Sequence, residues 1–293
     1  MDYILLILAD VLLALNFSAN KVYQNNAGTS LKAGLRFNYM YGLFVAIVFF
    51  AINGFRFDIS IFSLIMSGIH TGAVVSYNLI GFKLMKSGAM SLYTMFLMTG
   101  GMTLPYIWGV LFLDEKLTVF RILALVAIFA GVVLANLSKT KIKAAQIWMC
   151  IAVFVLNGIT SISSKEHQIE QVYKCVGEND FIIIGGIFQF VVCAIICLFL
   201  KNKQNKENEE NLKINARLFM MLVLISVIAS GTSSFLLLFT ARTVPATLLY
   251  PFVTGGTIVC TTMAATLAFK ERISRNHVIG VVLCFLGTVL FLF

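Results

Sequence analysis

Long apolar stretches, separated by short polar links, follow one another through almost the whole of this 293-residue chain. A helix needs about 20 apolar residues to cross the hydrocarbon core of a bilayer. On that criterion the sequence predicts ten transmembrane helices. They are expected at residues 3–23, 32–53, 60–82, 89–113, 118–137, 146–164, 181–200, 217–240, 244–268 and 275–293. The first stretch has no basic segment before it, so we expect a transmembrane helix there and not a cleavable signal peptide.

The composition excludes a soluble protein. Hydrophobic residues make up 59% of the chain and charged residues only 12%, whereas a soluble domain carries about 25% charged residues. A water-soluble fold of this size could not cover so much apolar surface. We therefore expect an all-α integral membrane protein whose environment is the lipid bilayer.

The net charge of +9 does not indicate a nucleic-acid partner. Lys and Arg lie mostly in short links between apolar stretches, for example Lys139, Lys141 and Lys143, as is typical of loops in membrane proteins. No basic stripe alternates with aromatic residues, so nucleic-acid binding is not expected. Five of the six cysteines lie inside apolar stretches without zinc-ligand spacing, which predicts neither a disulfide framework nor a metal site.

The two halves of the sequence resemble each other. Residues 113–134 read LDEKLTVFRILALVAIFAGVVL, and residues 269–290 read FKERISRNHVIGVVLCFLGTVL. Upstream of each, the sequence Thr-Gly-Gly occurs at residues 99–101 and 254–256. The duplication predicts two five-helix repeats.

We place these repeats at residues 1–140 and 141–293, with 201–216 as a mobile polar loop in the second. A weaker match pairs Asn20-Lys21 with Ser164-Lys165. Because five is an odd number, the second repeat must cross the membrane in the opposite orientation to the first. Inverted repeats recur in secondary carriers, where the substrate site lies between the repeats near the midplane.

The helix number, the duplicated acidic loop followed by a glycine-containing helix, and the Gly/Pro-interrupted fourth helix resemble the drug/metabolite transporter superfamily, EamA type. The resemblance implies a carrier, often an exporter, for metabolites, amino acids, nucleotide sugars or drugs, with no bound cofactor. It also implies a central cavity lined by the first, third and fourth helices of each half.

Polar side chains within the predicted helices are the candidates for a substrate or coupling site, because polar groups in a bilayer normally face the protein interior. Those at residues 247, 250, 254, 257 and 261 recur every three or four positions and so share one helix face. The candidate residues are Asp10, Asn16, Asn20, His70, Tyr77, Asn78, Thr99, Asn157, Ser161, Ser230, Tyr250, Thr254 and Thr257. Alternatively, each hydroxyl bonds back to its own helix or to a neighbouring one.

Asp10 is the one carboxylate well inside the predicted helices. A buried acid can exchange protons, so its protonation could alternate with substrate binding and couple export to proton entry. Alternatively, Asp10 lies near the headgroups or bonds to an Asn, Ser or Lys elsewhere in the chain. His70 is open to two interpretations in the same way, as a proton relay or as a histidine that only forms structural hydrogen bonds.

Glu115 and Glu271 occupy matching positions before the helices expected at 118–137 and 275–293. Thr118 and Ser274 are the expected N-cap residues there, and an acid near a helix N-terminus favours the positive end of the helix dipole. We interpret both glutamates as structural.

Two predictions about orientation conflict. The odd-numbered loops hold most of the Lys and Arg, so the positive-inside rule would place both termini outside. Precedent in the resembled family places them in the cytoplasm. Both alternatives stay open.

A small-molecule transporter in the plasma membrane is the function that the sequence favours. A membrane-embedded enzyme would need paired carboxylates, a Ser/His dyad or a metal cluster, and the nearest hydroxyl to His70 on its helix is Ser67. A receptor or scaffold would be favoured by a large soluble segment, and the sequence has none. Hydroxyl stripes suit a neutral, zwitterionic or weakly charged substrate, with protons as the candidate coupling ion. The residues carry no signal for oligomeric state.

Overall fold

The structure, a computed structural model, describes residues 2–28, 30–86, 90–136, 144–203, 214–270 and 273–291. These residues form ten α-helices. The first repeat holds α1 (Asp2–Ala27), α2 (Leu31–Ile52), α3 (Ile61–Lys86), α4 (Met90–Phe112) and α5 (Val119–Asn136). The second holds α6 (Ala144–Ile169), α7 (Glu178–Lys203), α8 (Ala216–Ala241), α9 (Ala246–Leu267) and α10 (Arg275–Leu290). The all-α prediction is confirmed. The repeat boundary near 140 and most of the 201–216 loop lie outside the described residues.

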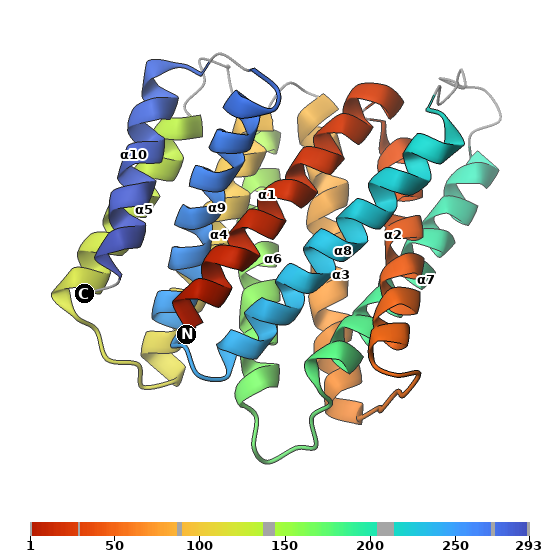
Figure 1. Ribbon diagram of the computed structural model, residues 1–293, viewed down its shortest axis with the longest axis horizontal. Coiled ribbons are helices and arrows are strands. Elements are labelled where there is room, and N and C mark those ends of the chain that lie inside the picture. Colours follow the sequence, from red (N-terminus) through yellow and green to blue (C-terminus); the bar gives the residue numbers. More distant parts are fainter. Residues whose placement is uncertain are drawn as a thin grey trace.

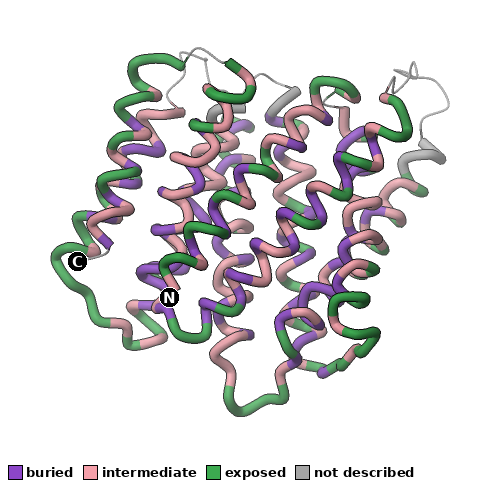
Figure 2. The backbone as a smooth tube through the Cα atoms, in the orientation of Figure 1, coloured by how far each residue is buried: buried purple, intermediate pink, exposed green. Residues whose placement is uncertain are grey.

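The helices have the length and surface of membrane spans. Over the described residues, nine are long and apolar enough to cross a bilayer, and α10 is a shorter apolar helix of 16 residues. Large apolar side chains stand exposed on the outside, such as Trp148 at 72% and Phe199 at 73%. Exposed positions follow the outer faces of the helices in Figure 2. Such a surface belongs in lipid, and the chain is a multi-pass membrane protein.

Local signals in the sequence set several helix boundaries. The Ser30 side chain accepts a hydrogen bond of 3.2 Å from the backbone N–H of Ala33 and so caps α2. Ser274 caps α10 through His277 in the same way, as predicted. Pro105 and Pro251 lie inside α4 and α9. Each removes one helical hydrogen bond, which makes these the two interrupted helices of the fold.

Helix packing follows a two-fold pattern. Helix α1 packs against α8 and α9, and its counterpart α6 packs against α3 and α4. Helices α2 and α7 pair with each other, as do α5 and α10, and α4 contacts α9. Each pairing is reproduced when five is added to, or subtracted from, both helix numbers. Most of the extensive contacts therefore join one half of the chain to the other.

The two halves run in opposite directions. In Figure 1, α1 starts at the lower edge of the bundle, whereas α6 ends there and is followed by the loop leading to α7. Both chain termini lie toward this lower edge. The arrangement is the one expected for inverted five-helix repeats.

Glycines bring α2 and α7 into close contact. A methyl group on Gly42 would lie 2.8 Å from the carbonyl oxygen of Gly186, and a methyl group on Gly186 would lie 2.8 Å from that of Gly42. Each glycine thus leaves room for the backbone of the other helix. Small residues at membrane helix contacts permit such backbone-to-backbone approach.

Candidate functional site

Asp10 is buried where α1 packs against α9. The residue is 1% exposed, and its Oδ1 atom accepts a hydrogen bond of 2.8 Å from the Thr257 hydroxyl. A methyl group on Gly256 would overlap Oδ2, and among the described residues this oxygen has no hydrogen-bond partner. Asp10 is therefore enclosed by protein. It bonds to one residue of the predicted α9 stripe, with one carboxyl oxygen left without a partner.

Asn157 and Ser161 connect α6 to α4 at the Thr-Gly-Gly segment. The Asn157 amide donates a 2.7 Å hydrogen bond to the carbonyl oxygen of Leu97. Ser161 donates to the carbonyl oxygen of Gly101 at 3.1 Å. A methyl group on Gly101 would overlap the Asn157 side-chain nitrogen. Both candidate residues thus lie at a contact between the two halves.

Tyr250 extends this contact to α9. Its hydroxyl donates a hydrogen bond of 2.5 Å to the carbonyl oxygen of Ser161. Two candidates from the predicted stripes, one on α6 and one on α9, are thereby brought together. Thr261, one turn beyond Thr257, instead donates to the Thr257 carbonyl oxygen of its own helix.

His70 lies between α3 and α6. Its Nδ1 atom is 3.1 Å from the carbonyl oxygen of Thr160 and 3.1 Å from the hydroxyl oxygen of Ser164. Because a carbonyl oxygen can only accept, Nδ1 carries the proton in this arrangement. The geometry describes a histidine engaged in a helix–helix hydrogen bond, and the proton-relay alternative stays untested.

A group of tyrosines lies beside Ser230 on α8. Tyr41 lies near Ser230, and Tyr77 lies near Tyr41. Tyr93 in turn lies near Tyr77. Tyr41 on α2 was not among the residues expected at the site, because the sequence reasoning confined the cavity to other helices.

The remaining candidates either bond within their own helix or are half-buried on it. Asn20 donates to the Asn16 side chain on the same helix at 3.3 Å. Thr99 donates to the carbonyl oxygen of Met95, four residues earlier, at 2.7 Å, which is the back-bonding alternative for this hydroxyl. Asn78 and Thr254 are half-buried on α3 and α9.

Glu115 has a structural role, but at a different helix from the one expected. Its two carboxylate oxygens accept hydrogen bonds from the backbone N–H groups of Ala246 at 2.6 Å and Thr247 at 2.8 Å. It therefore caps the N-terminus of α9, and the expectation that it serves the helix beginning near residue 118 was wrong. Thr118 does accept from the N–H of Arg121 at 3.3 Å. Glu271 lies outside the described residues.

Lys165 joins α6 to the turn between α8 and α9. It is 5% exposed, and its Nζ atom donates hydrogen bonds to the carbonyl oxygens of Ala241 at 2.7 Å and Val244 at 2.8 Å. Carbonyl groups at a helix C-terminus have no partner within the helix, and a cation there complements the helix dipole. This residue was missed because the sixth helix was expected to end at residue 164.

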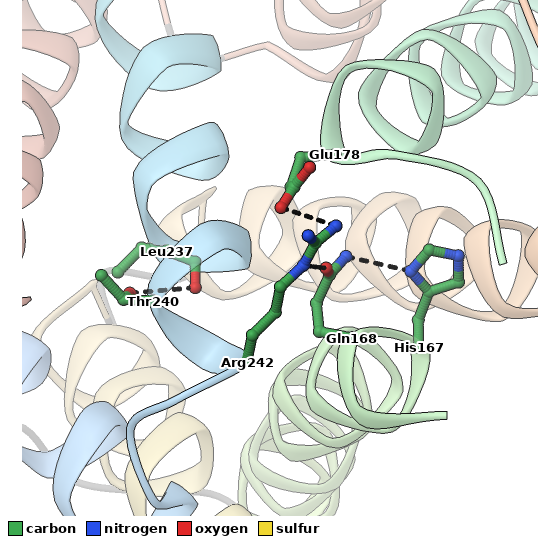
Figure 3. Close-up of polar contacts among 6 residues, drawn as sticks. All are labelled: His167, Gln168, Glu178, Leu237, Thr240 and Arg242. Atoms are coloured by element: carbon green, nitrogen blue, oxygen red, sulfur yellow. Dashed lines mark hydrogen bonds and ion pairs between the residues drawn. The ribbon is translucent and has the colours of Figure 1, made fainter. Parts of the chain in front are cut away.

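A second polar cluster, also missed, lies beyond Lys165 and is shown in Figure 3. Arg242 donates from Nε to the Gln168 side-chain oxygen at 3.1 Å and forms an ion pair of 2.8 Å with Glu178. The Gln168 amide in turn lies 3.0 Å from Nδ1 of His167. Nε2 of His167 is 2.8 Å from the Ser63 hydroxyl. The cluster links α3, α6, α7 and the end of α8.

A pocket of about 300 Å³ lies beside this cluster, against the loop between α6 and α7. Backbone N–H groups donate to the Glu170 carboxylate and hold its pKa below the usual value, and the N–H group of Val172 has the largest effect. Partial burial raises the pKa of the Cys175 thiol. Within the described part of the chain, no group of three or more His, Cys, Asp or Glu residues could hold a metal ion.

Comparison with known proteins gives a family match for part of the chain and a structural likeness for nearly all of it. Residues 174–293 match the model of the EamA-like transporter family. The match covers less than half of the chain. One solved structure, titled only as the crystal structure of a protein, superimposes on 97% of this chain and 94% of its own, with a TM-score of 0.71 at 13% identity. That likeness shows the fold alone. No curated protein matches the sequence.

The resemblance to EamA-type drug/metabolite transporters is therefore confirmed. The family match indicates a membrane transporter. The roles of the individual candidate residues remain predictions.

Proposed function

We propose that this protein is a secondary carrier that exports a small, neutral or zwitterionic metabolite or drug-like compound across the plasma membrane. The two halves, residues 1–140 and 141–293, act as inverted repeats with the substrate path between them. Protonation of Asp10 is coupled to substrate movement.

The observation that carries the proposal is the placement of buried polar side chains where one half meets the other. Asp10 bonds to Thr257 across the α1–α9 contact, and Asn157 bonds across the α4–α6 contact. Polar groups inside a membrane protein are costly to bury and mark ion and substrate pathways. The match of residues 174–293 to a transporter family supports the same conclusion.

Alternating access follows from this layout as a relative movement of the two halves. Contacts between halves must break on one side of the membrane and form on the other in each cycle. A carboxyl group at such a contact can take up a proton in one state and release it in the other, so the proton gradient would drive export.

The test is a metabolite profile of cells and medium. Cells would express the protein, its Asp10→Asn variant, or an empty vector, with membrane levels matched by immunoblot. We expect one compound or compound class to shift across the membrane with the intact protein and not with the variant. Asp2→Asn is the matched control, because it makes the same change at the end of the same helix, where Asp2 is half-buried and accepts a hydrogen bond from Thr243.

Two results count against parts of the proposal. If Asp10→Asn exports as well as the intact protein, transport stands and the coupling role of Asp10 is rejected. If no compound moves, and purified protein is not stabilised by any compound in a thermal-shift screen, the carrier function itself is rejected.

A further inference from the structure

Two of the contacts that join the halves, α1 with α9 and α6 with α4, are built alike. On α1, the Asp10 side chain lies against Gly256, where an added methyl group would overlap its Oδ2 atom. On α6, the Asn157 side chain lies against Gly101, where an added methyl group would overlap its Nδ2 atom. Gly101 and Gly256 are the last residues of the two Thr-Gly-Gly segments. A carboxyl group and an amide of almost the same shape thus contact the matching glycine of each Thr-Gly-Gly segment.

The two groups differ in what they can donate. The Asn157 amide donates to the Leu97 carbonyl oxygen at 2.7 Å, and an amide keeps its N–H groups at every pH. A carboxyl group can donate only when it is protonated. Oδ1 of Asp10 is occupied by the Thr257 hydroxyl, and the buried Oδ2 faces α9 without a partner among the described residues. Protonation at Oδ2 would supply the donor that Asn157 always has.

The surroundings of Asp10 favour its neutral form. Helix α8 has no titratable side chain between Arg217 and Arg242 at its ends. On α9 the titratable residues are Tyr250, which bonds to Ser161, and Cys260, which interacts electrostatically with Asp10. On α1 itself they are Asp2, Tyr3, Lys21 and Tyr23. Lys21 lies about 16 Å along the helix, with its ammonium over the Phe269 ring. A buried carboxylate without a neighbouring cation is strongly disfavoured.

We propose that the α1–α9 contact is controlled by protonation of Asp10 and that the α4–α6 contact is its permanent counterpart. Gly256 is the positioning residue that lets the carboxyl group lie against α9. Uptake of one proton by the carboxylate closes the contact, and its release opens the contact and exposes Asp10 to water. The inference rests on the proposed carrier function, in which the two halves move relative to each other, and it makes the cycle asymmetric between the two repeats.

The experiment measures thermal unfolding of purified protein in detergent between pH 5 and pH 9. We expect the melting temperature of the unmodified protein to fall by several degrees as the pH rises, because the ionised carboxylate opposes the closed contact. Asp10→Asn carries a permanent donor, so its melting temperature should vary less with pH. Asp2→Asn should retain the full dependence.

The reverse exchange provides a second, independent test. Asn157→Asp places an ionisable group in the permanent contact, so its melting temperature should fall more steeply with pH than that of the unmodified protein. Gly256→Ala should lower the melting temperature, and less so in the Asp10→Ala background, because the smaller side chain leaves room for the methyl group. The proposal is overturned if Asp10→Asn and the unmodified protein show the same pH dependence.

These readouts do not require transport. If the unmodified protein exports a compound but Asp10→Asn leaves the pH dependence unchanged, the carrier function stands and this inference fails. If the pH dependence behaves as expected but no compound is moved, the contact is protonation-controlled and the carrier function fails.

Discussion

Gly131 on α5 and Gly280 on α10 face each other so closely that neither can carry a side chain in place. A methyl group on Gly131 would lie 2.6 Å from the Gly280 carbonyl oxygen, and one on Gly280 would lie 2.5 Å from that of Gly131. The same mutual relationship holds between Gly42 and Gly186 on α2 and α7. Both peripheral helix pairs are therefore held by backbone contact across the two halves.

We predict that Gly131→Ala lowers stability by about 1–3 kcal/mol, because the added methyl group meets backbone that must shift. Gly72→Ala is the control, since a methyl group there would have nothing within 4 Å. Thermal unfolding in detergent should show a lower melting temperature for Gly131→Ala only. Equal melting temperatures for the two variants would contradict the close packing of α5 on α10.

Removal of the Glu115 side chain should destabilise α9, although the residue lies before α5. Its carboxylate accepts from two backbone N–H groups at the start of α9, and loss of a cap of this kind costs about 1–2 kcal/mol. We expect Glu115→Ala to lower the melting temperature and Glu115→Gln to lower it less, because one acceptor oxygen remains. The exposed neighbour Lys116 provides the control, Lys116→Ala. An unchanged melting temperature for Glu115→Ala would reject the cap.

Much of the fold could be predicted because it depends on composition along the chain. Apolar stretches of spanning length gave the number and approximate limits of the helices, and the duplicated Glu115 and Glu271 segments indicated the repeat. The stripe on α9 could also be predicted, since helical periodicity places Tyr250, Thr254 and Thr257 on one face. Among these, Thr257 is the residue that bonds to Asp10.

The partners of these residues could not be predicted, because they are set by packing between helices far apart in sequence. Asp10 and Thr257 are 247 positions apart, and Glu115 bonds to a helix that starts 131 positions later. Lys165 was missed because charge ends an apolar stretch, whereas α6 continues to Ile169. The match between Lys165 and Lys21 in the other half was the one sequence feature that pointed to Lys165.

Cys175 should report which side of the membrane carries the termini. It lies in the loop between α6 and α7, near the edge of the bundle where both termini lie. We expect a membrane-impermeant maleimide to label Cys175 from the same side as a tag at residue 1. Because burial raises the thiol pKa above its ordinary 9.0, less thiolate is present at neutral pH and the labelling rate should still increase above pH 9.

The control for this labelling is Cys175→Ser, which should remove the signal. Labelling of Cys175 and of the terminal tag from opposite sides would contradict the even number of membrane crossings between them. The side on which both are labelled decides between the two orientations that the sequence leaves open.

Lys165 should stabilise the contact between α6 and the turn that joins α8 to α9. Its ammonium group donates to two carbonyl oxygens at the α8–α9 turn, so Lys165→Met leaves these acceptors unsatisfied in a buried place, at a cost of about 1–3 kcal/mol. We expect a lower melting temperature and faster proteolysis at the turn near Arg242. Lys174→Met, an equal change at an exposed lysine, should alter neither. If Lys165→Met unfolds at the same temperature as Lys174→Met, the two hydrogen bonds contribute nothing to the stability of the folded protein.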